Sequence, residues 1–257
     1  MNEIRRLKLY SEIEDSISIF DNLDYSIITG GFVQNPQKLS DVDVITVLPC
    51  VSKNIEEQII SFAKRHVNAQ INNGFIPDPH FPSDILTRGQ ILDAINGRSF
   101  VIENNRIKLV DYSQEEYINN PESDYRIWVY EMISHDFDII RGSFDILVND
   151  TITALKTIWL YTVSLFDYTS EIPIEQVRHD LFLTAGLPYY LNEKQCRYFI
   201  TMLKKYEMAT ITGDGILLLN DEIINEQIIK LQETINKGFS STHFIKWDVL
   251  RKKVSRK

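Results

Sequence analysis

Cysteine is scarce in this sequence, and long apolar runs are missing. Cys50 and Cys196 are the only cysteines among 257 residues, and they form no C-x-x-C pair. This is not the cysteine pattern of a small disulfide-stapled domain, and free thiols are typical of a reducing compartment. The first residues lack the apolar core of a signal peptide, and the most apolar stretch, from Ala154 to Phe166, contains Lys156 and is too short to span a bilayer. We therefore expect a cytoplasmic protein without membrane contact.

Positive charge is also in short supply. The chain has 27 lysines and arginines against 36 aspartates and glutamates, a net charge of −9. Such a surface repels phosphate backbones, which makes nucleic acid an unexpected partner. The five histidines show no metal-ligand spacing, so we interpret them as structural or surface residues.

Hydrophobic periodicity predicts an α+β protein with two domains, residues 1–115 and 116–257. Short apolar runs that are typical of strands occur only in the first part, and helical periods dominate from about residue 122. The strands expected in the first part are 25–29, 41–48 and 83–87, with a hairpin of 99–102 and 106–110. The helices expected there are 7–22, 52–67 and 88–95. The helices expected in the second part are 123–140, 150–167, 173–185, 192–208 and 220–237.

The most informative stretch runs from residue 25 to residue 48. An apolar segment ends in Gly30-Gly31, and Asp41-Val42-Asp43 opens the next apolar segment. A glycine pair at a strand end allows another group to approach the backbone closely. Strand side chains alternate between faces, so two aspartates two positions apart in one strand point the same way. Because their charges repel unless a cation lies between them, the pair indicates a cation site.

A third carboxylate has the same local setting. Asp84 lies at the start of another apolar segment, and the residues between it and Asp43 are enough for a helix that crosses over and brings two parallel strands together. Asp78, between two prolines, is the alternative third acid. Oxygen ligands suit Mg²⁺, and three carboxylates can hold two such ions in phosphoryl chemistry.

These motifs resemble the nucleotidyltransferase superfamily of the DNA polymerase β type. The likeness lies in an apolar strand, Gly-Gly, a nine-residue spacer, an acid-aliphatic-acid strand and a later third acid, within about residues 25 to 100. It implies an N-terminal nucleotidyltransferase α/β domain with a mixed sheet. The helical second half is similar to the substrate-binding helical bundle of small-molecule members, such as the aminoglycoside nucleotidyltransferases.

The resemblance also implies roles for single residues. Asp41 and Asp43 would hold the metal ions that bind the triphosphate of an NTP. Asp84 would hold the catalytic metal and help to deprotonate the attacking hydroxyl. The phosphates would be contacted by the backbone at Gly30 and Gly31, and the turn would be supported by Ser40.

A cation from the second domain is expected to reach the triphosphate. Lys156 is the first choice, because it interrupts an apolar helix face where an unpaired ammonium is costly. The alternatives on the predicted helices are Arg126, Arg141 and Arg178.

The function implied by the resemblance is metal-dependent nucleotidyl transfer. An NMP, expected to be AMP from ATP, would move to a hydroxyl of a small-molecule acceptor, and pyrophosphate would be released. Two alternatives stay open. One is a toxin-like enzyme that nucleotidylates a macromolecule, either a protein or a tRNA. The other is a catalytically inactive module that binds a nucleotide.

Overall fold

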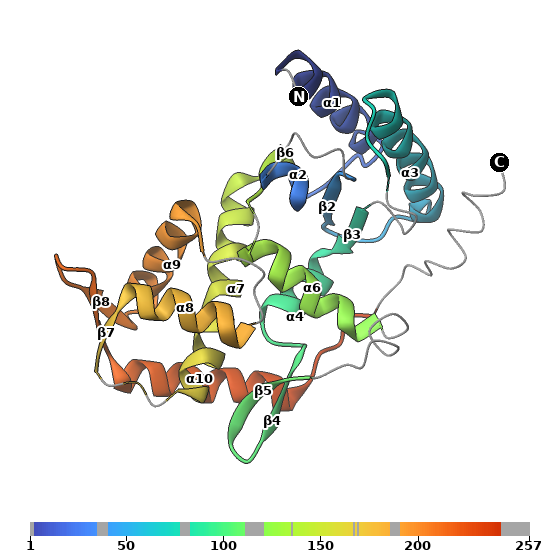
Figure 1. Ribbon diagram of the computed structural model, residues 1–257. Helices are drawn as coiled ribbons and strands as arrows, with labels where there is room; N and C mark the ends of the chain where they lie inside the picture. The colour runs from blue at the N-terminus through green and yellow to red at the C-terminus, as the bar shows by residue number, and fades with distance from the viewer. Residues whose placement is uncertain are drawn as a thin grey trace. The chain divides into compact units, whose positions relative to one another are not determined.

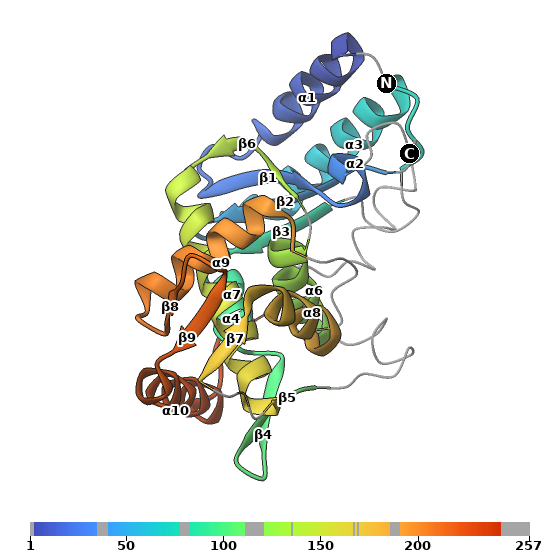
Figure 2. The ribbon, with the colours of Figure 1, turned by 60° about the vertical axis from the view of Figure 1, so that its left-hand side comes forward.

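The computed structural model describes a mixed α and β protein that divides into two compact units (Figures 1 and 2). The first unit holds the described residues up to Ile91, those from 136 to 147 and Thr242, and the second holds those of 92–134 and 148–241. The residues described are 3–34, 41–77, 83–110, 121–134, 136–166, 168, 170–185 and 191–242.

A four-stranded mixed sheet, in the order β3-β2-β1-β6, is the scaffold of the first unit. Strand β1 (Tyr25–Thr29) pairs antiparallel with β2 (Asp43–Leu48) on one side and with β6 (Asp138–Gly142) on the other. Strand β2 also pairs parallel with β3 (Ser83–Thr87). The expected mixed sheet is therefore present.

Helix α3 (Ile55–Asn72) makes the crossover that the parallel pairing of β2 with β3 requires. It packs beside α1 (Glu3–Ile17), and the two helices lie together over the sheet (Figures 1 and 2). Their apolar faces share one core with the sheet residues Ile28, Val44 and Ile85. Because strand side chains alternate, the residues next to these in sequence face the other side of the sheet.

A capping box starts helix α4 (Arg88–Ile95) directly after β3. The Thr87 N–H donates to Gln90 Oε1 at 2.9 Å, and the Gln90 N–H donates to Thr87 Oγ1 at 3.2 Å. These reciprocal bonds fix the point at which the strand ends and the helix begins.

The second unit is largely helical and contains two small sheets. Its helices lie in the regions where helical periods were predicted, because each helix buries one apolar stripe, whereas its three-stranded sheet was not predicted. The hairpin of β4 (Phe100–Glu103) and β5 (Arg106–Leu109) is confirmed. The helices are α6 (Pro121–Ser134), α7 (Phe144–Leu165), α8 (Ile174–Ala185), α9 (Glu193–Lys205) and α10 (Asp221–Lys237). The three-stranded sheet has the order β7 (Glu171–Pro173), β9 (Ile216–Leu219), β8 (Ala209–Ile211).

The expectation that strands vanish after residue 122 is wrong. The predicted helix 123–140 ends at Ser134, and Asp138–Gly142 is the edge strand β6 of the first sheet. Strand β6 belongs to the first unit, although the residues before and after it belong to the second. The units are therefore not separated at a single point of the chain, whereas one division between residues 115 and 116 was expected. In the described part of the chain, no helix has both the length and the apolarity of a membrane span.

Gly142 at the end of β6 provides a test of this pairing. Its φ is +97°, and a Cβ added there would lie 2.6 Å from the Tyr25 Cα and would also collide with the Asp24 carbonyl. Gly142→Ala is expected to lower the free energy of unfolding by about 1–3 kcal/mol, measured by urea denaturation. Gly213→Ala is the control, because nothing lies within 4 Å of its Cβ position. Equal effects of the two substitutions would contradict this account of β6.

Candidate functional site

Strand register brings two of the three predicted acids to one face of the first unit's sheet. Asp84 in β3 lies opposite Ile45 in β2, and Ile45 is two positions from Asp43. Paired residues share a face, as do residues two apart in one strand, so Asp43 and Asp84 face the same way. This is the face opposite the α1 and α3 core, because Val44 and Ile85 belong to that core.

Asp41 lies outside the strand that was predicted to contain it. Strand β2 begins at Asp43, so strand alternation does not set the direction of the Asp41 side chain. Its side chain is half-buried, as are those of Asp43 and Asp84. Within the described residues, no three His, Cys, Asp or Glu side chains are grouped closely enough to form a metal-ligand set. The structure thus places two acids on one face and holds the third just before the strand.

Gly30 follows β1 and supports the carboxylate of Asp43. Its φ is +75°, which favours glycine, and a Cβ added there would lie 2.5 Å from Asp43 Oδ2. The carboxylate therefore occupies space that any other residue at position 30 would fill. This contact follows from the register, because Thr29, just before Gly30, pairs with Asp43. Gly31 then opens the short helix α2 (Gly31–Gln34).

The backbone between the two aspartates is held by side chains that the sequence analysis did not connect with the site. The Val42 N–H donates to Gln70 Oε1 at 3.0 Å, and His66 Nε2 lies 3.0 Å from the Val42 carbonyl oxygen. Both side chains come from α3 and are fully buried. The interpretation of His66 as structural gave no hint of this contact, because the residues are far apart in sequence.

The remaining predicted residues of the first part fall outside the described ranges. Ser40 belongs to the segment 35–40, and Asp78 belongs to the segment 78–82. The choice between Asp84 and Asp78 as third acid therefore rests on Asp84 alone, which has the strand setting that was expected for it.

Lys156 lies on α7 in the second unit, half-buried. Its Nζ is 4.6 Å from the centre of the Tyr206 ring, a cation–π contact. Burial lowers the pKa of Lys156, and the ammonium groups of Lys205 and Lys230 lower it further. A cation with two cations as neighbours is one that an added anion would stabilise.

The alternative cations have partners of their own or another location. Arg126 donates to the Tyr130 hydroxyl at 2.9 Å, and Arg178 donates to Glu175 and to the Leu191 carbonyl. Arg141 was expected on a helix of the second domain, but it lies in β6 of the first sheet.

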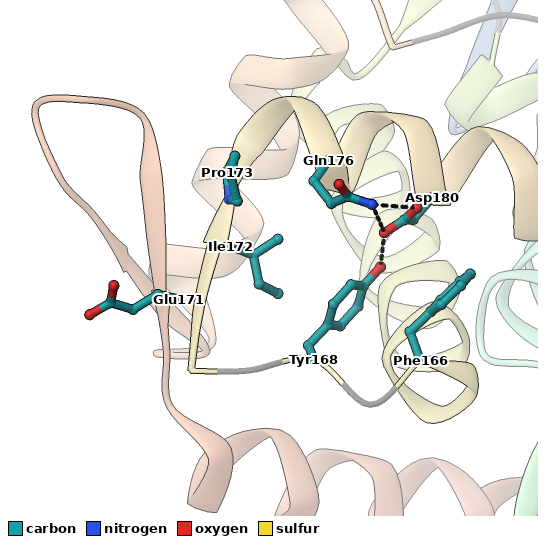
Figure 3. A pocket seen from close by; sticks show the side chains of 7 residues that line it. All are labelled: Phe166, Tyr168, Glu171, Ile172, Pro173, Gln176 and Asp180. Carbon is teal, nitrogen blue, oxygen red and sulfur yellow. Dashed lines mark hydrogen bonds between the residues drawn. The ribbon is translucent and has the colours of Figure 1, made fainter.

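A pocket of about 320 Å³ lies in the second unit between the end of α7 and helix α8 (Figure 3). At its wall the buried Asp180 carboxylate accepts a hydrogen bond from the Tyr168 hydroxyl at 2.7 Å and from Gln176 Nε2 at 3.2 Å. Burial and the bond to Asp180 raise the pKa of Tyr168. The Glu171 side chain points away from the others (Figure 3). The pocket's own donors thus satisfy its carboxylate, and the bond from Tyr168 links the segment after α7 to α8. The residues that line it are Phe166, Tyr168, Glu171, Ile172, Pro173, Gln176 and Asp180.

The contact between Gly30 and Asp43 can be measured with a double-mutant cycle. Gly30→Ala should lower the free energy of unfolding by about 1–3 kcal/mol, because alanine is strained at positive φ and its Cβ meets the carboxylate. In an Asp43→Ala background the same substitution should cost less, since only the backbone strain remains. We expect a coupling energy of about 0.5–3 kcal/mol from urea denaturation of the four proteins.

Gly74→Ala is the matched control for that cycle. Gly74 also has a positive φ, +73°, but its added Cβ would meet the flexible end of the Arg5 side chain. Its effect should be independent of Asp43. Additive effects of Gly30→Ala and Asp43→Ala would show that the two residues do not touch.

The chain was also compared with known proteins. The first unit offers a strand pair with facing aspartates and a glycine-supported carboxylate, and the second offers a half-buried lysine and a small pocket. No protein-family model, no curated protein and no solved structure matches the chain.

Proposed function

We propose that this protein is a nucleotidyltransferase that moves an NMP from an NTP to a hydroxyl of a small-molecule acceptor and releases pyrophosphate. ATP is the proposed donor, so the transferred group is AMP. One observation carries the proposal. Asp43 and Asp84 share a face of the adjacent strands β2 and β3, and the Asp43 carboxylate lies over Gly30 at the end of β1, the other neighbour of β2. We further propose that the first unit is the catalytic domain and that the helical second unit binds the acceptor.

The donor chemistry of the site fits Mg²⁺. Carboxylate oxygens are the ligands that this hard cation prefers, and it is usually shared with substrate phosphates. In the proposal Asp41, Asp43 and Asp84 hold two ions, which neutralise the charge of the triphosphate when they are bound. The space over Gly30 supports this arrangement, because it lets the Asp43 carboxylate lie next to the turn where phosphates would be held.

The other residues of the proposed site hold the nucleotide. The backbone at Gly30 and Gly31 contacts phosphate oxygens, and Ser40 supports the turn. Lys156 supplies a positive charge from the second unit. Its half-buried ammonium, next to Lys205 and Lys230, favours this assignment because an anion would relieve their repulsion.

The proposed reaction is an in-line displacement at the α-phosphorus. The acceptor oxygen forms a new bond to the α-phosphorus, and the bond from that phosphorus to the bridging oxygen of the β-phosphate breaks. Pyrophosphate leaves with the electron pair of the broken bond. Asp84 takes the proton of the acceptor hydroxyl. Holding both reactants in line supplies much of the rate enhancement in such sites.

Isothermal titration calorimetry with a non-hydrolysable ATP analogue tests the nucleotide site. We expect binding that requires Mg²⁺ and disappears when the metal is removed with a chelator. Asp43→Asn and Asp84→Asn should each weaken it at least about tenfold, because each removes a charged ligand of a divalent ion. Asp138→Asn is the matched control, since Asp138 lies in the same sheet but binds Arg6 and Tyr10 of α1. Binding without metal, or unchanged by these substitutions, would refute the proposed site.

A second prediction concerns Lys156. Lys156→Met should raise the thermal unfolding midpoint, because it removes a half-buried charge whose pKa is lowered by burial and by Lys205 and Lys230. The gain should shrink as the pH rises toward the ordinary pKa of lysine, about 10.4, where the unfolded chain also loses the proton. The same variant should bind the ATP analogue more weakly. A variant that is more stable and binds normally would exclude Lys156 from the nucleotide site.

The acceptor class can be read from one labelling experiment. Protein incubated with Mg²⁺, α-labelled ATP and a small-molecule extract should yield pyrophosphate and a labelled small product. Label on a protein or an RNA band would indicate the macromolecular alternative. Nucleotide binding without pyrophosphate release for any acceptor would indicate the inactive module.

A further inference from the structure

We propose that His66 and Gln70 are positioning residues that hold Asp41 and Asp43 in the geometry needed to bind a divalent cation. The inference rests on the proposed function, because it assigns a purpose to the backbone of the candidate metal site. It concerns two side chains of helix α3 that touch neither metal nor nucleotide in the proposal. They act through Val42, the residue between the two aspartates.

The contacts form a compact buried cluster on the inner face of α3. Gln70 Oε1 accepts the Val42 N–H at 3.0 Å, and Gln70 Nε2 lies 3.5 Å from the Val42 carbonyl oxygen. His66 Nε2 lies 3.0 Å from the same carbonyl and 2.9 Å from Gln70 Nε2. The ring of Phe62 stacks on the His66 ring at 5.4 Å between centroids, which fixes its orientation. A single face of α3 thus supplies the whole cluster, from residues spaced four apart.

The cluster fixes both peptide planes that flank Val42. The Val42 N–H belongs to the peptide unit shared with Asp41, and the Val42 carbonyl belongs to the unit shared with Asp43. Hydrogen bonds to both groups therefore restrict the backbone on either side of the residue. Each plane includes the Cα atom of one aspartate, so the points at which the two aspartate side chains leave the backbone are held in place.

Each neutral tautomer of His66 makes a hydrogen bond through one of the two contacts of Nε2. With the proton on Nε2, the ring donates to the Val42 carbonyl. With the proton on Nδ1, Nε2 accepts from the Gln70 amide. The bond from the Val42 N–H to Gln70 Oε1 is present in both cases, so Gln70 is the member on which the cluster depends most.

The choice of polar residues at these buried positions needs a reason. Elsewhere the inner face of α3 is largely apolar, with Ile59 and Phe62 in the shared core. Burying an amide and an imidazole costs free energy unless their hydrogen bonds are made. Here the cost is offset at Val42, where β2 has not yet begun and the segment depends on bonds to α3 side chains.

A fixed backbone also keeps the two aspartates in place despite the repulsion between their charges. Two carboxylates separated by one residue repel each other when no cation is present, and a free segment would turn them apart. Supporting residues that lock a site before its ligand arrives strengthen binding, and their loss commonly lowers metal affinity 10- to 100-fold. We infer that His66 and Gln70, which together form a clamp on Val42, have this role.

The test measures the affinity for Mn²⁺ together with a non-hydrolysable ATP analogue in the full chain. Gln70→Leu and His66→Leu should each weaken binding by about 10- to 100-fold. His66→Gln places an amide nitrogen near the position of Nε2 and should restore affinity to within about threefold of wild type. A folded Gln70→Leu protein with wild-type affinity would overturn the positioning role.

Asn73→Ala is the control for general loss of stability. Asn73 is also buried at the end of α3, but its Nδ2 donates to Glu12 Oε2 and to the Ala69 carbonyl, both at 2.8 Å. It should lower the unfolding midpoint as the clamp variants do, yet leave the Mn²⁺ affinity within about twofold. Equal loss of affinity in Asn73→Ala would show that instability alone explains the effect, and would overturn the inference.

Hydrogen exchange of the Val42 amide separates the clamp from the proposed function. Gln70→Leu should speed this exchange at least about tenfold more than that of the α3 amides, because only Val42 loses its acceptor. Unchanged exchange would refute the clamp itself. A third outcome is faster exchange in Gln70→Leu together with no binding of metal and nucleotide by the wild-type protein. It would confirm the contact with Val42, but it would overturn the proposed function and the positioning role that rests on it.

Discussion

The pairing of β2 with both of its neighbours is the constraint on which the candidate site depends. The antiparallel pairing with β1 sets Asp43 beside the residue before Gly30, and the parallel pairing with β3 sets Asp84 on the same face. A shift of one residue in either pair would turn a carboxylate into the core shared by α1 and α3. The apolar residues of that core therefore fix the register of the strands, and the register determines the face of the sheet on which Asp43 and Asp84 lie.

The same core places polar groups where the sheet needs them. Helix α3 connects β2 to β3, and side chains of its inner face bond to Val42, just before β2. That geometry is why His66 and Gln70 can reach Val42 while Phe62 packs among apolar side chains. The crossover helix thus serves the fold and the segment between the aspartates together.

Lys156 differs from the other polar residues described in the second unit, because its electrostatic neighbours have the same charge. Asp180 accepts from Tyr168 and Gln176, and Arg178 is bonded to Glu175. Lys156 instead lies on an aromatic ring with two other lysines as its electrostatic neighbours. That environment disfavours its charged form, and it supports the proposal that an anionic substrate group lies there when bound.

Local pattern alone was enough to place β1, β3, α4 and the hairpin of β4 with β5, because apolar runs, capping residues and turn signals all lie within the segments themselves. It also identified the glycine and the acids that the register later brought together. Strand β6 was missed, since it contains charged residues and owes its strand form to pairing with β1, more than a hundred residues earlier. The clamp on Val42 was not predicted either, because it also depends on long-range contacts: His66 and Gln70 are 24 and 28 residues away from Val42. The sequence by itself determined which residues each of these elements contains. Which of those residues face one another was decided by long-range pairing, because no local pattern encodes it.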